Sequence, residues 1–246
     1  RWIGGSDMKY TQVYSSKELK DKFIDFTKQM LGLQADGLCA AVYTQITDVE
    51  DEENGLITYD RKVVKVDNQQ LAEIRKAVQA NITHTSIPVS SVSKLGNEVK
   101  KWRYTITNKS LSSDSWKDIS FYDKIWKEGF SGFGNGSLQG ANINTVWNTQ
   151  YIYMRRWFNF NDLNSANINN FRLEIFYDED CEVYINGVLA ASLKGFTNHY
   201  TFVEISEKAK SSIKIGQPNL VAVKCRNTEG NQFIDLGFVL TNIPIK

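Results

Sequence analysis

Helical and strand-like patterns of apolar residues alternate along the first third of the chain. Ser15 and Glu18 have the spacing of a capping box, in which each residue satisfies a free backbone group at a helix start. The apolar residues that follow recur at helical spacing: Leu19, Phe23, Phe26, Met30 and Leu33. This pattern predicts a helix over residues 15–33, which Gly32 or Gly37 can end.

A second helix is predicted after Asp67, which with Gln70 repeats the capping spacing. The predicted helix covers residues 69–81, and its apolar face consists of Leu71, Ile74, Val78 and Ile82.

An apolar run and an acidic loop separate these two helices. Leu38 to Thr44 is continuously apolar and predicts a strand that is buried on both faces. A loop with five acidic residues follows, and the Asn54-Gly55 turn ends it. Helix, buried strand, loop and helix in this order predict part of an α/β fold with a parallel sheet.

The pattern changes to β structure in the second half. Residues 86–100 are polar and turn-prone, and they are predicted to be a linker. Alternating strands are predicted at residues 102–107, 151–158, 171–176, 200–205, 219–226 and 233–240. Residues 181–191 form a hairpin pattern around Asn186-Gly187. We therefore expect a mainly β protein, with a jelly-roll β-sandwich over residues 101–246 after an α/β segment.

Composition narrows the classes of function. The 246 residues carry a formal charge of +1 with acidic and basic residues interspersed, so no nucleic-acid partner is expected. No stretch of about 18 apolar residues occurs, so no membrane span is expected. Cys39, Cys181 and Cys225 match no metal or redox spacing and are predicted to be buried free thiols. No metal and no cofactor are expected, and His84 and His199 are interpreted as residues without a functional role.

Two stretches carry a resemblance to a known family. Residues 37–50, GLCAAVYTQITDVE, continuing with ENGLITYDR at 53–61, resemble the end of the catalytic barrel in bacterial family 2-like, β-galactosidase-like glycoside hydrolases. The resemblance implies that Leu38–Thr44 is strand 8 of a (β/α)₈ barrel and that residues 1–85 are the C-terminal fragment of that barrel. Residues 147–158, 177–187 and 219–223 resemble the galactose-binding-like jelly roll that follows the barrel in some of these enzymes.

The resemblance also implies where the chemistry lies. A retaining glycosidase uses two carboxylates about 5–5.5 Å apart. The family carries them at the ends of barrel strands 4 and 7, which would precede Arg1. The start Arg1-Trp2-Ile3-Gly4-Gly5 also leads us to expect a longer parent polypeptide. We therefore expect the C-terminal part of a glycoside hydrolase, inactive by itself, with no catalytic residue of its own.

Five residues are candidates for carbohydrate contact. Thr44 and Gln45 are expected at the rim of the sugar pocket of the parent, and Asp48 and Glu50 hold the acidic loop or touch substrate. The other acids, Asp51, Glu52 and Glu53, are interpreted as a solvated loop. Trp147 either stacks on a sugar ring or fills the end of the sandwich core, and the second interpretation is favoured.

Further interpretations stay open. Arg155 and Arg156 point to opposite faces of their strand, and a structural ion pair with Asp178 or Asp180 is favoured over a ligand contact. The sandwich is either a brace for the barrel, a free-standing lectin-like carbohydrate-binding module, or a purely structural domain. The apolar helix faces predict either self-association or a repacked N-terminal segment. A periplasmic or secreted location is expected.

Overall fold

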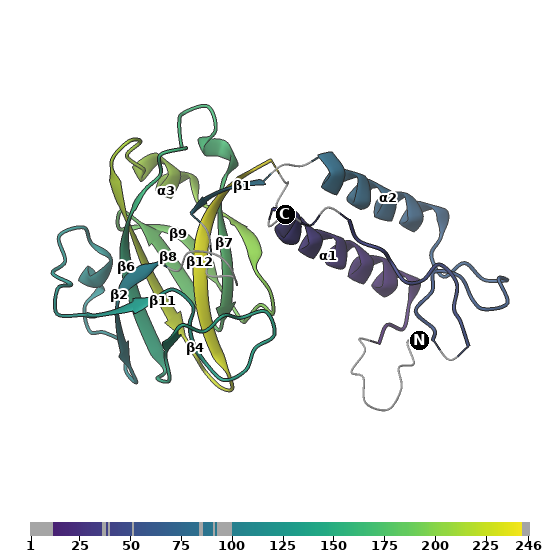
Figure 1. The fold of residues 1–246 in the computed structure, drawn as a ribbon, viewed down its shortest axis with the longest axis horizontal. Coiled ribbons are helices and arrows are strands. Elements are labelled where there is room, and N and C mark those ends of the chain that lie inside the picture. The colour runs from purple at the N-terminus through teal and green to yellow at the C-terminus, as the bar shows by residue number, and fades with distance from the viewer. Residues whose placement is uncertain are drawn as a thin grey trace. The chain divides into compact units, whose positions relative to one another are not determined.

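The computed structural model describes residues 12–35, 38, 40–50, 52–83, 86–90, 92 and 100–242. The chain forms two compact units, residues 1–84 and 85–246, and each is described by itself. Figure 1 labels their helices and strands. The predictions for Arg1 to Gly5, Cys39, Asp51 and His84 lie outside the described residues.

The first unit contains both predicted helices, α1 (Ser16–Ala35) and α2 (Asn68–Thr83). At the start of α1 the Ser15 hydroxyl accepts from the Glu18 amide at 3.1 Å, and the Tyr14 amide donates to the Glu18 carboxylate at 2.7 Å. Helix α1 continues through Gly32, so this glycine does not end it.

The start of α2 has a complete capping box. The Gln70 amide donates to the Asp67 carboxylate at 2.7 Å, and the Asp67 amide donates to the Gln70 side chain at 2.9 Å. Both helix starts were therefore correctly predicted from residue spacing.

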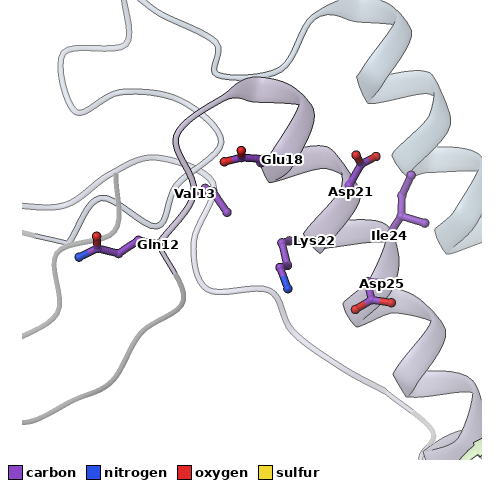
Figure 2. A pocket seen from close by; sticks show the side chains of 7 residues that line it. All are labelled: Gln12, Val13, Glu18, Asp21, Lys22, Ile24 and Asp25. Atoms are coloured by element: carbon purple, nitrogen blue, oxygen red, sulfur yellow. The ribbon is translucent and has the colours of Figure 1, made fainter. Parts of the chain in front are cut away.

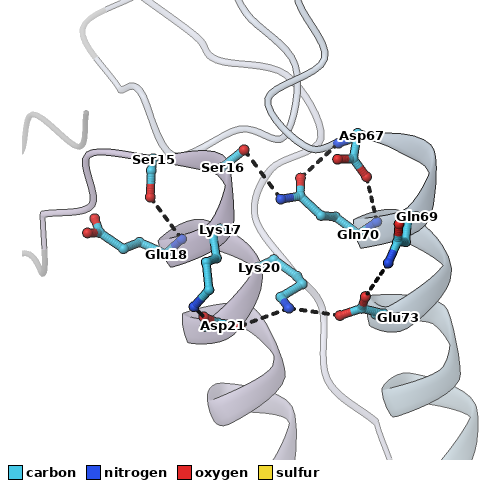
Figure 3. A network of polar contacts seen from close by, with 10 residues as sticks. All are labelled: Ser15, Ser16, Lys17, Glu18, Lys20, Asp21, Asp67, Gln69, Gln70 and Glu73. Carbon is cyan, nitrogen blue, oxygen red and sulfur yellow. Dashed lines mark hydrogen bonds and ion pairs between the residues drawn. The ribbon is translucent and has the colours of Figure 1, made fainter.

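The two helices lie side by side, as Figure 3 shows. The Lys20 ammonium bridges them, because it contacts Glu73 of α2 at 2.8 Å as well as Asp21 of α1 at 3.0 Å. The Gln70 side chain donates to the Ser16 hydroxyl at 3.3 Å. The first unit also contains a small core of Val13, Leu19, Val66 and Ile74.

The predicted strand at Leu38–Thr44 is wrong in the structure. The described residues of this run adopt no strand, and the Val42 side chain is 89% exposed. A strand needs a neighbour that pairs with its backbone groups. The described part of the first unit supplies isolated bridges, such as the parallel bridge between Thr47 and Ile57, and no sheet. The expected α/β segment therefore has its helices but not its parallel sheet.

The second unit is a β-sandwich, as predicted. One six-stranded sheet has the order β10-β7-β12-β4-β5, with β1 also pairing with β12, and the other has the order β3-β2-β6-β11-β8-β9 (Figure 1). The strands of the first sheet are β1 (Ser86–Ser90), β4 (Phe133–Asn135), β5 (Thr145–Val146), β7 (Phe171–Asp178), β10 (Thr201–Glu204) and β12 (Gln232–Thr241). Those of the second are β2 (Lys101–Thr107), β3 (Lys127–Phe130), β6 (Tyr151–Asn159), β8 (Cys181–Ile185), β9 (Val188–Leu193) and β11 (Pro218–Arg226). Three short helices lie between strands of this unit, at Asp114–Lys117, Ile168–Asn170 and Glu207–Ser212 (α3).

Alternation along the strands places the core between the sheets. On β6, Ile152, Met154 and Phe158 belong to the large apolar core, whereas Tyr153 packs with Trp116 in a smaller cluster. The side chains of β6 therefore divide between two faces with the period of two that the sequence predicts.

The Asn186-Gly187 hairpin was also correctly predicted. Asn186 has φ 51° and Gly187 has φ 84°, as a type I′ turn between β8 and β9 requires.

Two segments differ from the sequence prediction. Residues 86–90 of the expected linker form β1, which pairs antiparallel with β12. The glycine-rich stretch after Gly129, whose composition is typical of a turn-rich loop, contains β4. A Cβ at Gly129 would lie 2.8 Å from the side chains of Tyr104 and Thr145, so glycine there permits close packing. Among the described residues, no helix combines the length and apolarity needed to cross a membrane.

Candidate functional site

The acidic loop between the two helices is braced by its own backbone. The Asp48 amide donates to the Ile57 carbonyl at 2.8 Å, the Leu56 amide to the Ile46 carbonyl at 2.9 Å, and the Lys65 amide to the Leu56 carbonyl at 2.8 Å. These hydrogen bonds join three segments of the chain, around residues 46–48, 56–57 and 65. The loop therefore has a defined conformation although it belongs to no sheet.

Asp48 is the centre of this brace. It is 7% exposed, and its carboxylate accepts from the Gly55 amide at 2.8 Å and from the Lys65 ammonium at 2.6 Å. The same ammonium donates to the Glu53 carbonyl at 2.8 Å. A buried carboxylate with two charge-assisted partners is structurally satisfied. Of the two roles predicted for Asp48, its contacts are those of the residue that holds the loop.

Glycine at position 55 is required by the same contact. A Cβ there would lie 2.3 Å from the backbone nitrogen of Asp48 and from the carbonyl carbon of Thr47. The Asn54-Gly55 pair therefore allows one backbone to lie directly against another.

Gln45 and Thr44 precede the brace. The Gln45 amide group donates to Asn54 at 3.2 Å and to Glu52 at 3.3 Å. The Tyr43 hydroxyl donates to the Asn54 carbonyl at 2.6 Å, and burial, followed by the charge of Asp48, raises the pKa of Tyr43. Thr44 is exposed. These contacts hold the backbone around Thr44 while its hydroxyl faces solvent.

Glu50 occupies a tight turn. Its φ is 51°, and on either side of it the backbones of Val49 and Glu52 exchange two hydrogen bonds of 2.9 and 3.1 Å. The Glu50 side chain is exposed. The structure thus brings Gln45, Asp48 and Glu50 onto one braced loop, whereas Trp147 lies in the other unit.

Trp147 does not have the exposed ring that sugar stacking needs. Its side chain is fully buried in the core between the two sheets. The favoured interpretation is therefore confirmed, because the indole fills the core and the buried ring is not available for stacking on a sugar. An aromatic ring in a polar stretch is ambiguous from sequence because burial depends on distant strands.

Arg155 forms a structural ion pair, but not with the acids predicted for it. Its Nε donates to the Asp123 carboxylate at 2.9 Å, and its Nη1 donates to the carbonyls of Trp116 and, at 3.1 Å, Asp118. Asp178 and Asp180 are not its partners. Arg155 thereby anchors the connection between the 3₁₀ helix at 114–117 and β3.

The anchored connection presents apolar side chains to solvent. Tyr122 is 64% exposed and Ile125 is 80% exposed, although they flank Asp123, the partly buried partner of Arg155. Exposed apolar side chains that lie close together in sequence make this loop a candidate contact surface. Sequence reasoning missed this site, although the cluster FYDKIW at 121–126 was a usable signal.

Asp178 has the most unusual acidity of the described carboxylates. Burial at the end of β7, followed by the charge of Glu179, raises the pKa of Asp178 to about 6. Titratable groups with a shifted pKa are frequent at functional sites, and they also occur where a carboxylate is buried for structural reasons. Asp178 is the last residue of β7 and is buried, and among the described residues it belongs to no cluster that could hold a metal ion, so we interpret it as a buried strand end.

A hollow of about 490 Å³ lies along the start of α1, as Figure 2 shows. Two of its carboxylates, those of Asp21 and Glu18, already have partners. Asp21 pairs with Lys17 at 2.6 Å, and Glu18 caps the helix at Tyr14. We therefore assign no chemistry to it.

Comparison with known proteins gives structural similarity to family 2 glycoside hydrolases. No protein-family model and no curated protein matches the chain. A Bifidobacterium dentium β-glucuronidase, solved with coumarin-3-O-glucuronide, is 17% identical with a TM-score of 0.38, and the match covers 60% of this chain and 21% of that one. A Bacteroides uniformis β-glucuronidase is 13% identical with a TM-score of 0.39, covering 61% and 18%. A glycosyl hydrolase family 2 member from Bacteroides cellulosilyticus is 12% identical with a TM-score of 0.35, covering 60% and 20%. The chain spans about a fifth of the length of these structures.

Proposed function

We propose that this chain is the C-terminal, non-catalytic part of a bacterial β-galactosidase-like glycoside hydrolase. Retaining hydrolysis of O-glycosyl bonds would be performed by two carboxylates elsewhere in a longer polypeptide. The observation that carries the proposal is the exposure of the apolar residues Leu38, Ala40, Ala41 and Val42, which lead into a loop whose hydrogen bonds do not involve them. Apolar segments of this kind are normally covered by another part of the protein.

The braced loop suits the rim of a sugar pocket. Barrel enzymes bind substrate at the C-terminal ends of their strands, where the loops after the strands converge. Thr44 and Glu50 offer an exposed hydroxyl and an exposed carboxylate. Gln45 uses its amide nitrogen within the loop, which leaves its amide oxygen to accept from a sugar hydroxyl. Asp48 acts indirectly by holding the loop through Lys65.

An assay of two proteins tests this proposal. The chain described above is expected to release no aryl alcohol from aryl β-glycosides, and the longer polypeptide encoded by its gene is expected to hydrolyse one of them with retention. In the longer protein Gln45→Ala should raise KM, whereas Gln69→Ala on an exposed helix face should leave it unchanged. Hydrolysis by this chain alone, or an upstream sequence without a barrel and two strand-end glutamates, would refute the proposal.

The sandwich has two candidate roles, bracing the barrel or contacting carbohydrate. The connection between the 3₁₀ helix at 114–117 and β3, which Arg155 anchors, favours contact with carbohydrate. Its Tyr122 side chain is exposed, and the neighbouring Asp123 is held by Arg155. A tyrosine ring can stack on the apolar face of a sugar. This loop replaces Trp147 as the candidate contact.

Calorimetric titration with a panel of sugars separates the two roles. If the sandwich contacts carbohydrate, Tyr122→Ala abolishes binding, whereas Phe196→Ala, which removes another exposed aromatic ring, does not. The absence of binding to any sugar, together with loss of stability of the longer protein when residues 101–246 are deleted, would indicate a brace. We also infer a periplasmic or secreted location, which cell fractionation tests.

A further inference from the structure

Two cysteines face each other across neighbouring strands of the sandwich. Strands β8 and β11 pair antiparallel, and their register places Cys181 directly opposite Cys225. Both thiols are buried on the core side of the sheet. They are far apart in sequence, so only the strand pairing brings them together.

The type of pairing sets the distance between them. The Arg226 amide donates to the Asp180 carbonyl at 2.8 Å, and these two residues lie immediately outside the cysteine pair. Cys181 and Cys225 are therefore a non-hydrogen-bonded antiparallel pair, in which the Cα atoms lie about 4.5 Å apart and the side chains approach most closely. A disulfide spans a Cα separation of about 4.4–6.8 Å. The spacing expected for such a pair, about 4.5 Å, falls within this range.

The surroundings of the thiols agree with this geometry. The Cys225 thiol donates to the Glu179 carbonyl at 3.4 Å. Burial, followed by a hydrogen bond with the Cys181 thiol, raises the pKa of Cys225 well above its usual range. The two cysteine side chains thus interact directly, and both are shielded from solvent once the sandwich has formed.

We propose that Cys181 and Cys225 are a covalent modification site, at which a cross-strand disulfide forms while the sandwich folds in the presence of a small-molecule disulfide. One cysteine thiolate attacks the external disulfide, which breaks its S–S bond, forms a mixed disulfide and releases one external thiol. The second cysteine thiolate attacks the protein sulfur of the mixed disulfide and releases the second external thiol. The protein loses two protons and two electrons, and the external disulfide is reduced to two thiols.

The bond would stabilise the sandwich by closing the chain between β8 and β11. Residues 182–224 include the β8–β9 hairpin, β10 and α3. A loop of that length lowers the entropy of the unfolded chain considerably when it is closed. Burial then keeps soluble reductants from the bond.

Refolding in a redox buffer tests the proposal on the whole chain. The Cys39→Ser variant leaves two cysteines, so the product is unambiguous. This variant is unfolded, reduced, refolded with oxidised and reduced glutathione, and then denatured with N-ethylmaleimide. The expected product takes up no maleimide, weighs two hydrogen atoms less, and yields on digestion one peptide pair joined through Cys181 and Cys225. Its Tm should exceed that of the reduced sample by about 5–15 °C.

The contrary results are equally specific. A refolded chain that carries two maleimides, or that carries glutathione on either cysteine, would overturn the proposal. The matched variant Cys225→Ala in the same background should show the same Tm with and without reductant. Circular dichroism of the Cys39→Ser sample establishes that it has folded, so the result does not depend on whether Cys225→Ala folds.

Discussion

The carboxylate of Asp48 and the ammonium of Lys65 form an ion pair of 2.6 Å that joins the two sides of the acidic loop. Lys65 also reaches the Glu53 carbonyl, so one cation holds both the charged centre and the far end of the loop. The acids that follow the apolar run thus include one buried structural residue, Asp48, beside exposed ones such as Glu50 and Glu52.

Lys65→Met should loosen this loop. The substitution leaves the Asp48 carboxylate buried without its counter-ion, which costs about 1–3 kcal/mol. Hydrogen exchange of the Gly55 amide, which donates to Asp48, should accelerate accordingly. The control is Lys62→Met, because Lys62 and Asp60 form an exposed pair at 3.3 Å whose loss should change exchange little. Equal effects of the two variants would contradict the assigned role of Lys65.

Gly55→Ala should disrupt the same loop by crowding. The added methyl group meets backbone atoms at 2.3 Å, and backbone cannot rotate away as a side chain does. We expect a loss of about 2–3 kcal/mol in the local opening free energy, measured by hydrogen exchange over residues 46–57. Gly195→Ala, where φ is +69° and no atom lies within 4 Å, should cost about 1 kcal/mol from backbone strain alone. A tolerated Gly55→Ala would show that the close approach is not required.

Arg155→Lys should destabilise the sandwich although the charge is kept. An ammonium is a point donor and cannot reach the Asp123 carboxylate and two backbone carbonyls at once. The expected loss is about 2–4 kcal/mol in denaturant unfolding, because buried acceptors lose their donor. Arg103→Lys is the control, since Arg103 lies 3.8 Å from the same Asp123 and is about one third exposed. A near-neutral Arg155→Lys would refute the anchor.

Asp178 should give the sandwich a pH-dependent stability. The pKa of Asp178 is about 6 in the folded protein and about 3.8 in the unfolded chain, so between these pH values the folded state binds a proton that the unfolded state has released. Stability from this group is therefore complete below about pH 3.8 and is lost as the pH rises through 6. The Asp178→Asn variant should be more stable than the original protein at pH 7.5, by no more than about 3 kcal/mol, with a smaller difference at pH 4.5. Urea unfolding at the two pH values measures this, and a variant that is less stable at pH 7.5 would contradict it.

The exposed apolar residues of the first unit should cause self-association. Val42 and Ile46 are strongly exposed on the loop, and isolated proteins seldom leave such a segment bare. Light scattering should give a mass above that of one chain that rises with concentration. Val42→Ser with Ile46→Ser should lower it, whereas Ile215→Ser in the sandwich should not. A single-chain mass at all concentrations would rule the prediction out.

Short-range signals determined the elements that sequence alone predicts here. The capping residues Ser15 and Asp67, and the turn residues Asn186 and Gly187, act on backbone groups within four positions, so their geometry follows from spacing. The alternating strands of the sandwich were predictable for a similar reason, since a period of two needs no knowledge of the neighbouring strand.

Tertiary structure alone decided everything that depends on a distant partner. Four findings join segments whose spacing in the sequence does not relate them. These are the burial of Trp147, the ion pair of Arg155 with Asp123 rather than Asp178, the pairing of residues 86–90 with β12, and the pairing of Cys181 with Cys225. The apolar run at Leu38–Thr44 also depended on a distant partner, which it lacks among the described residues of the first unit. Its apolarity was visible in the sequence, but a strand forms only where another strand offers hydrogen bonds, and the described part of the first unit offers it none.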